Sequence, residues 1–252
     1  MRFFGLVWRG IRDVFEQFVF MVGMSLAWWL CAVPLVLGFL TLPFFLVLVL
    51  APLVGLLLAP ATVTLFAMAD PRRLVSRPDV PEAVAVFKSA VKRGWVIGLC
   101  TVPVLVVLFW NITYFTGTAS FLAAFVPLWA IMFISVFILM IYMFAVAGTM
   151  ESGLRNAFRG GMYVLVSRPF SSLFLSLLIM VVGVVLTVLV LPMVAFGPAL
   201  MAAVVNRFVL AGLGVEVIDP NAPTSEREFE RERGIEHDKT FIQRLRGSGR
   251  RT

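Results

Sequence analysis

The side chains that most often carry out catalysis are few in this chain and stand far apart. The only histidine, His237, is followed by Asp238, and the two cysteines, Cys31 and Cys100, lie within apolar runs. Nucleophilic, acid–base and metal chemistry needs such groups within reach of one another. No motif of a serine hydrolase, a zinc protease or a nucleotide-binding loop occurs. We therefore expect no enzymatic activity, no cofactor and no metal.

Four carboxylates outside the apolar runs are the remaining candidates for chemistry, namely Asp70, Asp79, Glu82 and Glu151. An enzyme acting at the membrane surface could use such groups as acids and bases. Their spacing matches no known pair, and Arg or Lys residues stand close to them in the sequence. We expect them to balance those positive charges.

The elements that would position any site are apolar and very long. The chain has 252 residues, of which 61% are hydrophobic and 14% charged, and its mean hydropathy is +1.00. No Asp, Glu, Lys or Arg occurs in residues 17–69, 94–150 or 169–206. This composition excludes a soluble globular enzyme and indicates a polytopic membrane protein.

The charge-free runs predict an all-α membrane domain of six transmembrane helices in three hairpins, because about 20 residues cross a bilayer. Each run is long enough for two spans, and Pro, Gly and polar residues interrupt it near its middle. The predicted spans are 14–36, 44–69, 95–115, 120–147, 169–191 and 195–213. Residues 1–214 thus form the transmembrane domain, and residues 215–252 a charged tail.

The positions of the basic residues predict the orientation. Every Lys and Arg lies in the amino-terminal segment, in residues 70–93, in residues 151–168 or towards the carboxyl end, and the three hairpin tips have none. By the positive-inside rule the basic segments are cytoplasmic. We therefore expect a multi-pass protein with both termini in the cytoplasm.

Two basic segments precede predicted helices and are predicted to contact the membrane surface. Basic residues four positions apart share one helix face, where they can bind anionic lipid phosphates of the inner leaflet. The candidate phosphate contacts are Lys88, Lys92, Arg93, Arg155 and Arg159. The two segments hint at a duplicated helix–basic-segment unit, although any membrane protein with cytoplasmic basic loops would show the same pattern.

The tail differs from the rest of the chain, because eight basic and eight acidic residues make 215–252 neutral. A capping box at Ser225 and Glu228 predicts a charged helix, and residues 239–246 predict a short amphipathic one. A solvated, partly disordered tail is an equal alternative. The candidate contacts to a protein partner are Phe229, Phe241, Ile242 and Leu245.

The predicted spans offer little to an ion-coupled transporter, which usually places ionisable residues within the membrane. Apart from Glu16 at the start of the first span, only Arg207 falls inside a span, and we expect it to reach the membrane surface. A cavity lined by Trp28, Asn111 or Tyr114 would favour a carrier. Asn111 is otherwise expected to cap its helix. The juxtamembrane basic residues do not suggest nucleic-acid binding.

Three sequence segments resemble the YesL-like family of bacterial membrane proteins. Residues 26–34 (LAWWLCAVP) are similar to the end of the family's first helix. Residues 59–66 (APATVTLF) resemble a segment of its second helix, and residues 87–93 (FKSAVKR) resemble its loop helix. The resemblance extends over about residues 1–212 and implies a bacterial inner-membrane protein.

The function implied by this resemblance is indirect. YesL-like proteins are often encoded beside carbohydrate ABC uptake systems, so the resemblance implies an accessory or regulatory component of such a transport complex, with a protein partner in the membrane. It assigns no functional residues. The alternatives are a transporter or lipid-handling protein in its own right, and a structural subunit of a larger assembly. The sequence predicts no oligomeric state.

Overall fold

A computed structural model describes residues 3–41, 57–74, 78–116 and 121–215, and these are helical apart from short connections. No strand occurs among them. The helices are α1 (Phe3–Glu16), α2 (Phe18–Thr41), the helix Leu57–Met68, α4 (Pro71–Leu74), α5 (Val80–Thr116), η1 (Phe121–Phe125), α6 (Val126–Thr149), α7 (Leu154–Ser167), α8 (Pro169–Val188) and α9 (Val190–Gly212).

Within the described residues, three helices are long and apolar enough to cross a membrane. They are Val80–Thr116, Ala123–Thr149 and Pro192–Gly212. Two pairs of shorter helices are sharply bent, by 95° between α1 and α2 and by 102° between α7 and α8. If each bent pair is one span, the number rises to five. The predicted all-α fold is therefore confirmed, whereas the six spans in three hairpins are not.

Several predicted boundaries were wrong. The first predicted span, 14–36, is broken at Gln17, where α1 ends and α2 begins in a new direction. The basic segment 88–92 and the predicted third span belong to one continuous helix, α5, because no residue between them interrupts it. Asn111 lies inside α5 and does not cap it. The sixth predicted span, 195–213, was placed too late, since α9 already begins at Val190 and contains Pro198.

The centre of the molecule is built from three helices, which we call the core helices: Leu57–Met68, α6 and α9. The Tyr142 ring of α6 stacks on Phe208 of α9, with ring centroids 6.0 Å apart. The Asn206 side chain of α9 donates to the carbonyl oxygen of Phe66 at 2.7 Å. A Cβ built at Gly148 of α6 would lie 2.8 Å from the Ala67 nitrogen. Each core helix thus contacts the other two.

Three further segments, which we call the bracing segments, each pack closely on one core helix, and α7 also reaches α9, where a Cβ at Gly212 would lie 3.0 Å from Val164. They are α1, residues 80–94 of α5, and α7, and each contains an Arg-Gly pair. A Cβ at Gly10 would lie 2.9 Å from Val204 Cα of α9, and one at Gly94 would lie 2.7 Å from the Pro60 nitrogen. One at Gly160 would lie 3.1 Å from Val146 of α6. At Gly10 and Gly94 the neighbouring backbone leaves no room for a Cβ, whereas at Gly160 the Val146 side chain would have to shift slightly.

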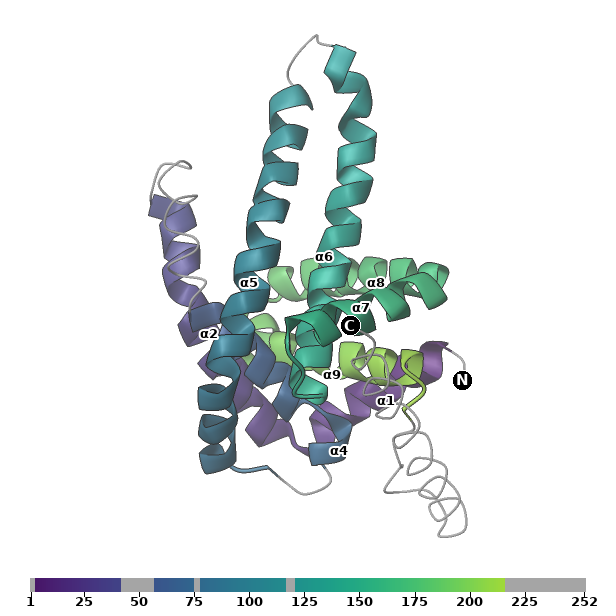
Figure 1. Ribbon diagram of the computed structural model, residues 1–252. Coiled ribbons are helices and arrows are strands. Elements are labelled where there is room, and N and C mark those ends of the chain that lie inside the picture. Colours follow the sequence, from purple (N-terminus) through teal and green to yellow (C-terminus); the bar gives the residue numbers. More distant parts are fainter. Residues whose placement is uncertain (1–2, 42–56, 75–77, 117–120, 216–252) are drawn as a thin grey trace.

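The order of these contacts closes a ring. The chain repeats one order three times, and we call each repeat a unit: a bracing segment, then a second helical stretch (α2, the rest of α5, or α8), then a core helix. Each bracing segment packs closely on the core helix of a different unit. α1 packs on α9, residues 80–94 of α5 pack on Leu57–Met68, and α7 packs on α6. The hint of a duplicated unit in the sequence thus corresponds to three similar units in the structure. In Figure 1, α5 and α6 extend side by side beyond this ring, and α8 crosses their direction.

Candidate functional site

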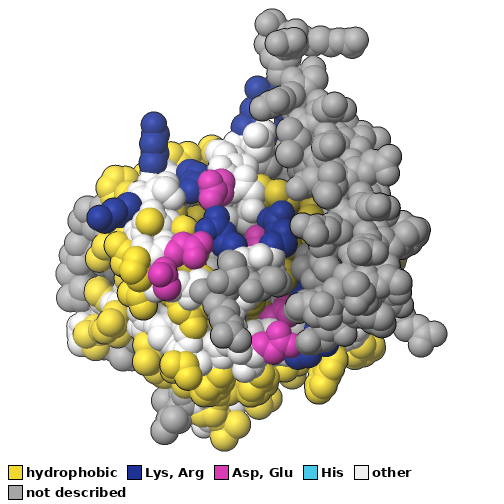
Figure 2. Space-filling model, turned by 90° about the horizontal axis from the view of Figure 1, so that it is seen from below, with side chains coloured by type: hydrophobic (Ala, Val, Ile, Leu, Met, Phe, Trp, Pro, Cys, Tyr) yellow, Lys and Arg dark blue, Asp and Glu magenta, His cyan; other side chains and the backbone are white. Residues whose placement is uncertain are grey.

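Charged side chains of both signs gather on one face of the molecule, where the core helices end. Figure 2 shows them interspersed on the face seen from below. Arg73 links two elements there, because its guanidinium contacts Glu82 of α5 at 3.2 Å and Glu151, which follows α6, at 2.6 Å. Asp79 accepts a hydrogen bond from the Glu82 backbone nitrogen at 2.9 Å. Glu82 and Glu151 therefore balance a positive charge, as expected.

A second ion pair on this face ties the end of one core helix to the end of another. Asp70 is 2% exposed and binds Arg72 through both carboxylate oxygens, at 2.8–3.2 Å. Arg72 also donates to the carbonyl oxygen of Thr149 at 2.7 Å. Because the Asp70 carboxylate and the Thr149 carbonyl at the end of α6 bind the same guanidinium, the pair has a structural role.

The prediction that Arg207 reaches the membrane surface was wrong. Arg207 is 4% exposed and binds Asp13 of α1 with two hydrogen bonds, of 2.7 Å and 2.8 Å. A buried guanidinium needs a partner of this kind, since an unpaired charge in the interior is very unfavourable. The two residues lie 194 positions apart, so sequence reasoning did not pair them. The ion pair holds a bracing segment to a core helix.

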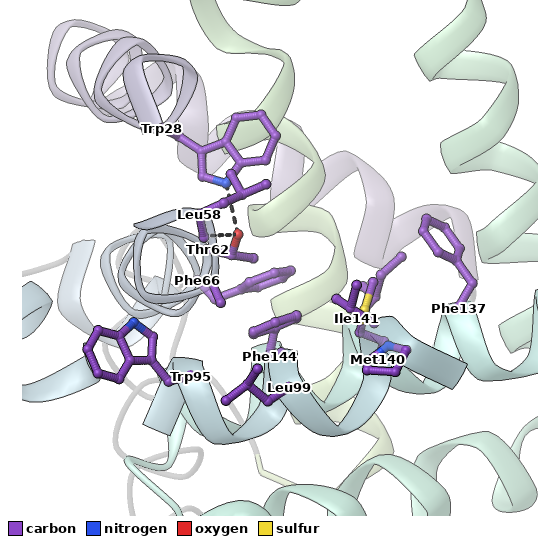
Figure 3. Close-up of a pocket in the computed structure, with 14 residues that line it drawn as sticks. Trp28, Leu58, Thr62, Phe66, Trp95, Leu99, Phe137, Met140, Ile141 and Phe144 are labelled. Atoms are coloured by element: carbon purple, nitrogen blue, oxygen red, sulfur yellow. Dashed lines mark hydrogen bonds between the residues drawn. The ribbon is translucent and has the colours of Figure 1, made fainter. Parts of the chain in front are cut away.

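An apolar cavity lies between α2, Leu57–Met68, α5 and α6, and we call it the four-helix cavity (Figure 3). Its volume is about 370 Å³. In the view of Figure 3, Trp28 of α2 lies above the aromatic rings of Phe66 and Phe144, and Leu99 of α5 lies below them. The remaining lining residues are Leu58, Ala59, Thr62, Trp95, Gly98, Val102, Pro103, Phe137, Met140 and Ile141.

The few polar groups of the four-helix cavity are already hydrogen-bonded. Trp28 Nε1 donates to Thr62 Oγ1 at 3.0 Å, and this hydroxyl donates to the Leu58 carbonyl oxygen at 2.8 Å. None of the described residues that line the cavity is charged. A sugar or an ion would need several free polar groups in its site. The lining is therefore suited to an apolar ligand.

A second cavity lies on the other side of α2. It measures about 710 Å³ and is bounded by α2, Leu57–Met68 and the first two turns of α5. The α2 residues in its wall include Gly23, Ala27 and Cys31, which are small and four positions apart, beside the larger Val19, Phe20, Met24 and Trp28. Trp28 lines both cavities, so α2 separates them.

The predicted site residues fall into three groups. Lys88, Lys92, Arg155 and Arg159 are exposed, whereas Arg93 is half-buried and donates to Ser89 Oγ at 3.1 Å. The predicted partner contacts Phe229, Phe241, Ile242 and Leu245 lie outside the described residues, as does His237.

The candidate carrier residues are not brought together. Trp28 lines both cavities, whereas Asn111 and Tyr114 lie near the end of α5 and line neither. Among the described residues, no three His, Cys, Asp or Glu side chains come close enough to hold a metal ion.

Sequence reasoning did not find the four-helix cavity, although one signal was present. Trp95, Leu99 and Val102 recur at helical spacing after the basic segment of α5. In a chain with so many apolar residues, this spacing did not distinguish a cavity wall from a lipid-facing surface. No protein-family model, curated protein or solved structure matches the chain.

Proposed function

We propose that this chain is a multi-pass membrane protein without enzymatic activity that binds the acyl chain of a membrane lipid in the four-helix cavity. The observation that carries the proposal is the lining of this cavity, which is apolar and whose Trp28 and Thr62 polar atoms already have partners. Its volume of about 370 Å³ lies within the range of small-molecule sites, about 300–1,000 Å³. Of the functions considered from the sequence, a lipid-handling protein agrees best with this lining.

The pairing of the buried charges supports the same proposal. Two buried carboxylates are paired with arginines towards the ends of the core helices: Asp13 with Arg207, and Asp70 with Arg72. A proton or ion pathway generally uses ionisable groups that can change partners within the membrane. These pairs instead join elements of the fold, which argues against ion-coupled transport.

A cavity-filling variant tests the proposal. Leu99→Trp adds bulk to the cavity wall, while Val107→Trp adds the same side chain at an exposed position of α5 outside the cavity. After purification in mild detergent, native mass spectrometry should detect one tightly held phospholipid on the wild type and on Val107→Trp. Leu99→Trp should lose it and keep its helical circular dichroism. Equal lipid retention by folded Leu99→Trp would refute the proposal.

We also propose how the chain is threaded, on the basis of its charge distribution. The basic segments lie in the cytoplasm, the α5–α6 connection lies outside, and the membrane is the bacterial inner membrane. On a cysteine-free background, Thr116→Cys should react with an impermeant maleimide in intact cells. Asn156→Cys, which is also exposed, should react only after lysis. The reverse labelling pattern would overturn this orientation.

A second candidate function is that of an accessory subunit of a membrane transport complex, such as one for carbohydrate uptake. It is favoured by the small residues Gly23, Ala27 and Cys31 along the second cavity, because such residues allow a transmembrane helix of a partner to approach closely. A photo-cross-linker at Ala27 should capture a permease subunit, whereas one at exposed Val184 of α8 should not. Identical products from both positions would refute this role.

A further inference from the structure

A continuous stripe on α5 joins two positive charges to the wall of the four-helix cavity. Lys88, Lys92, Trp95, Leu99 and Val102 follow one another at intervals of four, three, four and three residues. Residues at these intervals share one face of a helix. The last three line the cavity. The two ammonium groups therefore lie on the helix face of α5 that lines the cavity. They lie near the end of α5 that belongs to the charged face of the molecule.

The two lysines are available to a ligand. Both are exposed, and neither forms an ion pair with a described residue. Arg93 lies on a neighbouring face and is engaged with Ser89. An ammonium on a flexible stem can reach a phosphate at the membrane surface while its methylene groups cover apolar surface.

The axial spacing along α5 suits a lipid. At a rise of about 1.5 Å per residue, Lys92 lies about 4–5 Å below Trp95 and about 15 Å below Val102. Trp95 is 39% exposed and lies between the charges and the apolar wall. Tryptophan is common at this level, where headgroups meet acyl chains. A headgroup at the lysines thus leaves its chain beside the cavity.

The basic residues of α7 do not adjoin either of the two cavities. Arg155 and Arg159 are also exposed, yet neither of the two cavities includes a residue of α7. We therefore distinguish a general attraction to an anionic surface at α7 from a defined lipid site at α5.

We propose that the α5 stripe selects an anionic phospholipid, with its phosphate on Lys88 and Lys92 and one acyl chain in the four-helix cavity. This inference rests on the proposed function, because it assigns a headgroup class to the same cavity. Two lysines near an anionic surface give a preference of roughly 30-fold over a zwitterionic lipid of the same chain length.

The test uses the full chain in detergent and two lipid probes, phosphatidylglycerol and phosphatidylcholine with identical acyl chains. Native mass spectrometry measures the retained fraction of each probe in competition. The wild type should prefer phosphatidylglycerol about 30-fold, and Lys88→Gln/Lys92→Gln should reduce the preference to about threefold or less. Arg155→Gln/Arg168→Gln removes the same charge elsewhere and should keep the wild-type preference.

The two proposals fail in different ways. If Leu99→Trp retains both probes like the wild type, no chain occupies the cavity and the proposed function is wrong. If Leu99→Trp loses both probes but Lys88→Gln/Lys92→Gln keeps its preference, the cavity binds lipid and only the headgroup assignment is wrong. Equal loss of preference in the two double variants would show a diffuse charge effect and would also overturn the assignment.

Discussion

The two halves of α6 have the same apolar composition and opposite environments. Residues 138 and 142–149 are buried against the other core helices, whereas Leu128, Ile131 and Ile134 in the first half are about half exposed. The second half contacts α7 and α9 through Tyr142 and its neighbours. The first half lies on the α5–α6 hairpin, which extends beyond the ring (Figure 1). One helix thus passes from an interior held by the protein to a surface suited to lipid.

This difference shows which part of the molecule is held in place by specific contacts. At the charged end, glycine contacts, a buried ion pair and aromatic stacking fix the three core helices to their bracing segments. Beyond that end, the exposed side chains are large and apolar, and few interhelical polar contacts occur among the described residues. Substitutions in the two regions should therefore have unequal effects on stability.

The largest effect is expected from breaking the buried ion pair. Arg207→Ala leaves the Asp13 carboxylate unpaired at 7% side-chain exposure, which should lower the free energy of unfolding by about 3–5 kcal/mol. Thermal unfolding in detergent measures the loss. The double variant Asp13→Leu/Arg207→Met removes both charges and should recover most of the stability. If the single and double variants are equally unstable, the contact does not act as an ion pair.

The next prediction compares equivalent side chains in the two halves of α6. Met143 is 2% exposed and Met132 is 46% exposed. Met143→Ala should lower the free energy of unfolding by about 2–4 kcal/mol, because it leaves a void in a packed interior. Met132→Ala should change it by about 0.5 kcal/mol or less. Equal losses in thermal melts would contradict the contrast between the halves.

Glycine contacts provide a smaller and more local test. Gly94→Ala places a Cβ 2.7 Å from the Pro60 nitrogen, so the helices must separate at a cost of about 1–3 kcal/mol. Gly23→Ala is the control, since a Cβ there has no neighbour within 4 Å. It should stabilise α2 by about 0.5–1 kcal/mol, through helix propensity alone. The two alanine variants should therefore shift the melting temperature in opposite directions.

The sequence predicted the helical class and the membrane character because both follow from charge-free runs that exceed the length of a span. It also indicated the similarity of the basic segments at 88–92 and 155–159. It did not predict the break at Gln17, since the flanking residues are compatible with one helix and the bend accompanies the packing of α1 on α9. The pairing of Asp13 with Arg207 depends on the same packing.

The four-helix cavity was beyond sequence reasoning for a related reason. Its residues come from four helices, and each of its walls has the same composition as a lipid-facing surface. A cavity depends on where side chains are missing between helices, and a linear pattern does not record that. The lysine stripe, in contrast, lies on one helix. Its spacing can be read from the sequence, and the structure shows that three of its residues line the cavity.

The smallest effect on stability is expected from truncation just beyond α9, where the helices held by specific contacts end. Gly214 has φ +75°, and the Val215 nitrogen donates to the Leu210 carbonyl oxygen at 2.9 Å, so these two residues cap the helix. Truncation after Val215 keeps this cap and should change the free energy of unfolding by less than about 0.5 kcal/mol.

Truncation after Gly212 is the matched control for this cap. It removes the cap together with Leu213, which is 8% exposed, and should cost about 1–3 kcal/mol. Thermal melts of both forms in the same detergent make the comparison. A large loss on truncation after Val215 would mean that residues 216–252 belong to the fold, and the stable region would then extend beyond the core and bracing helices.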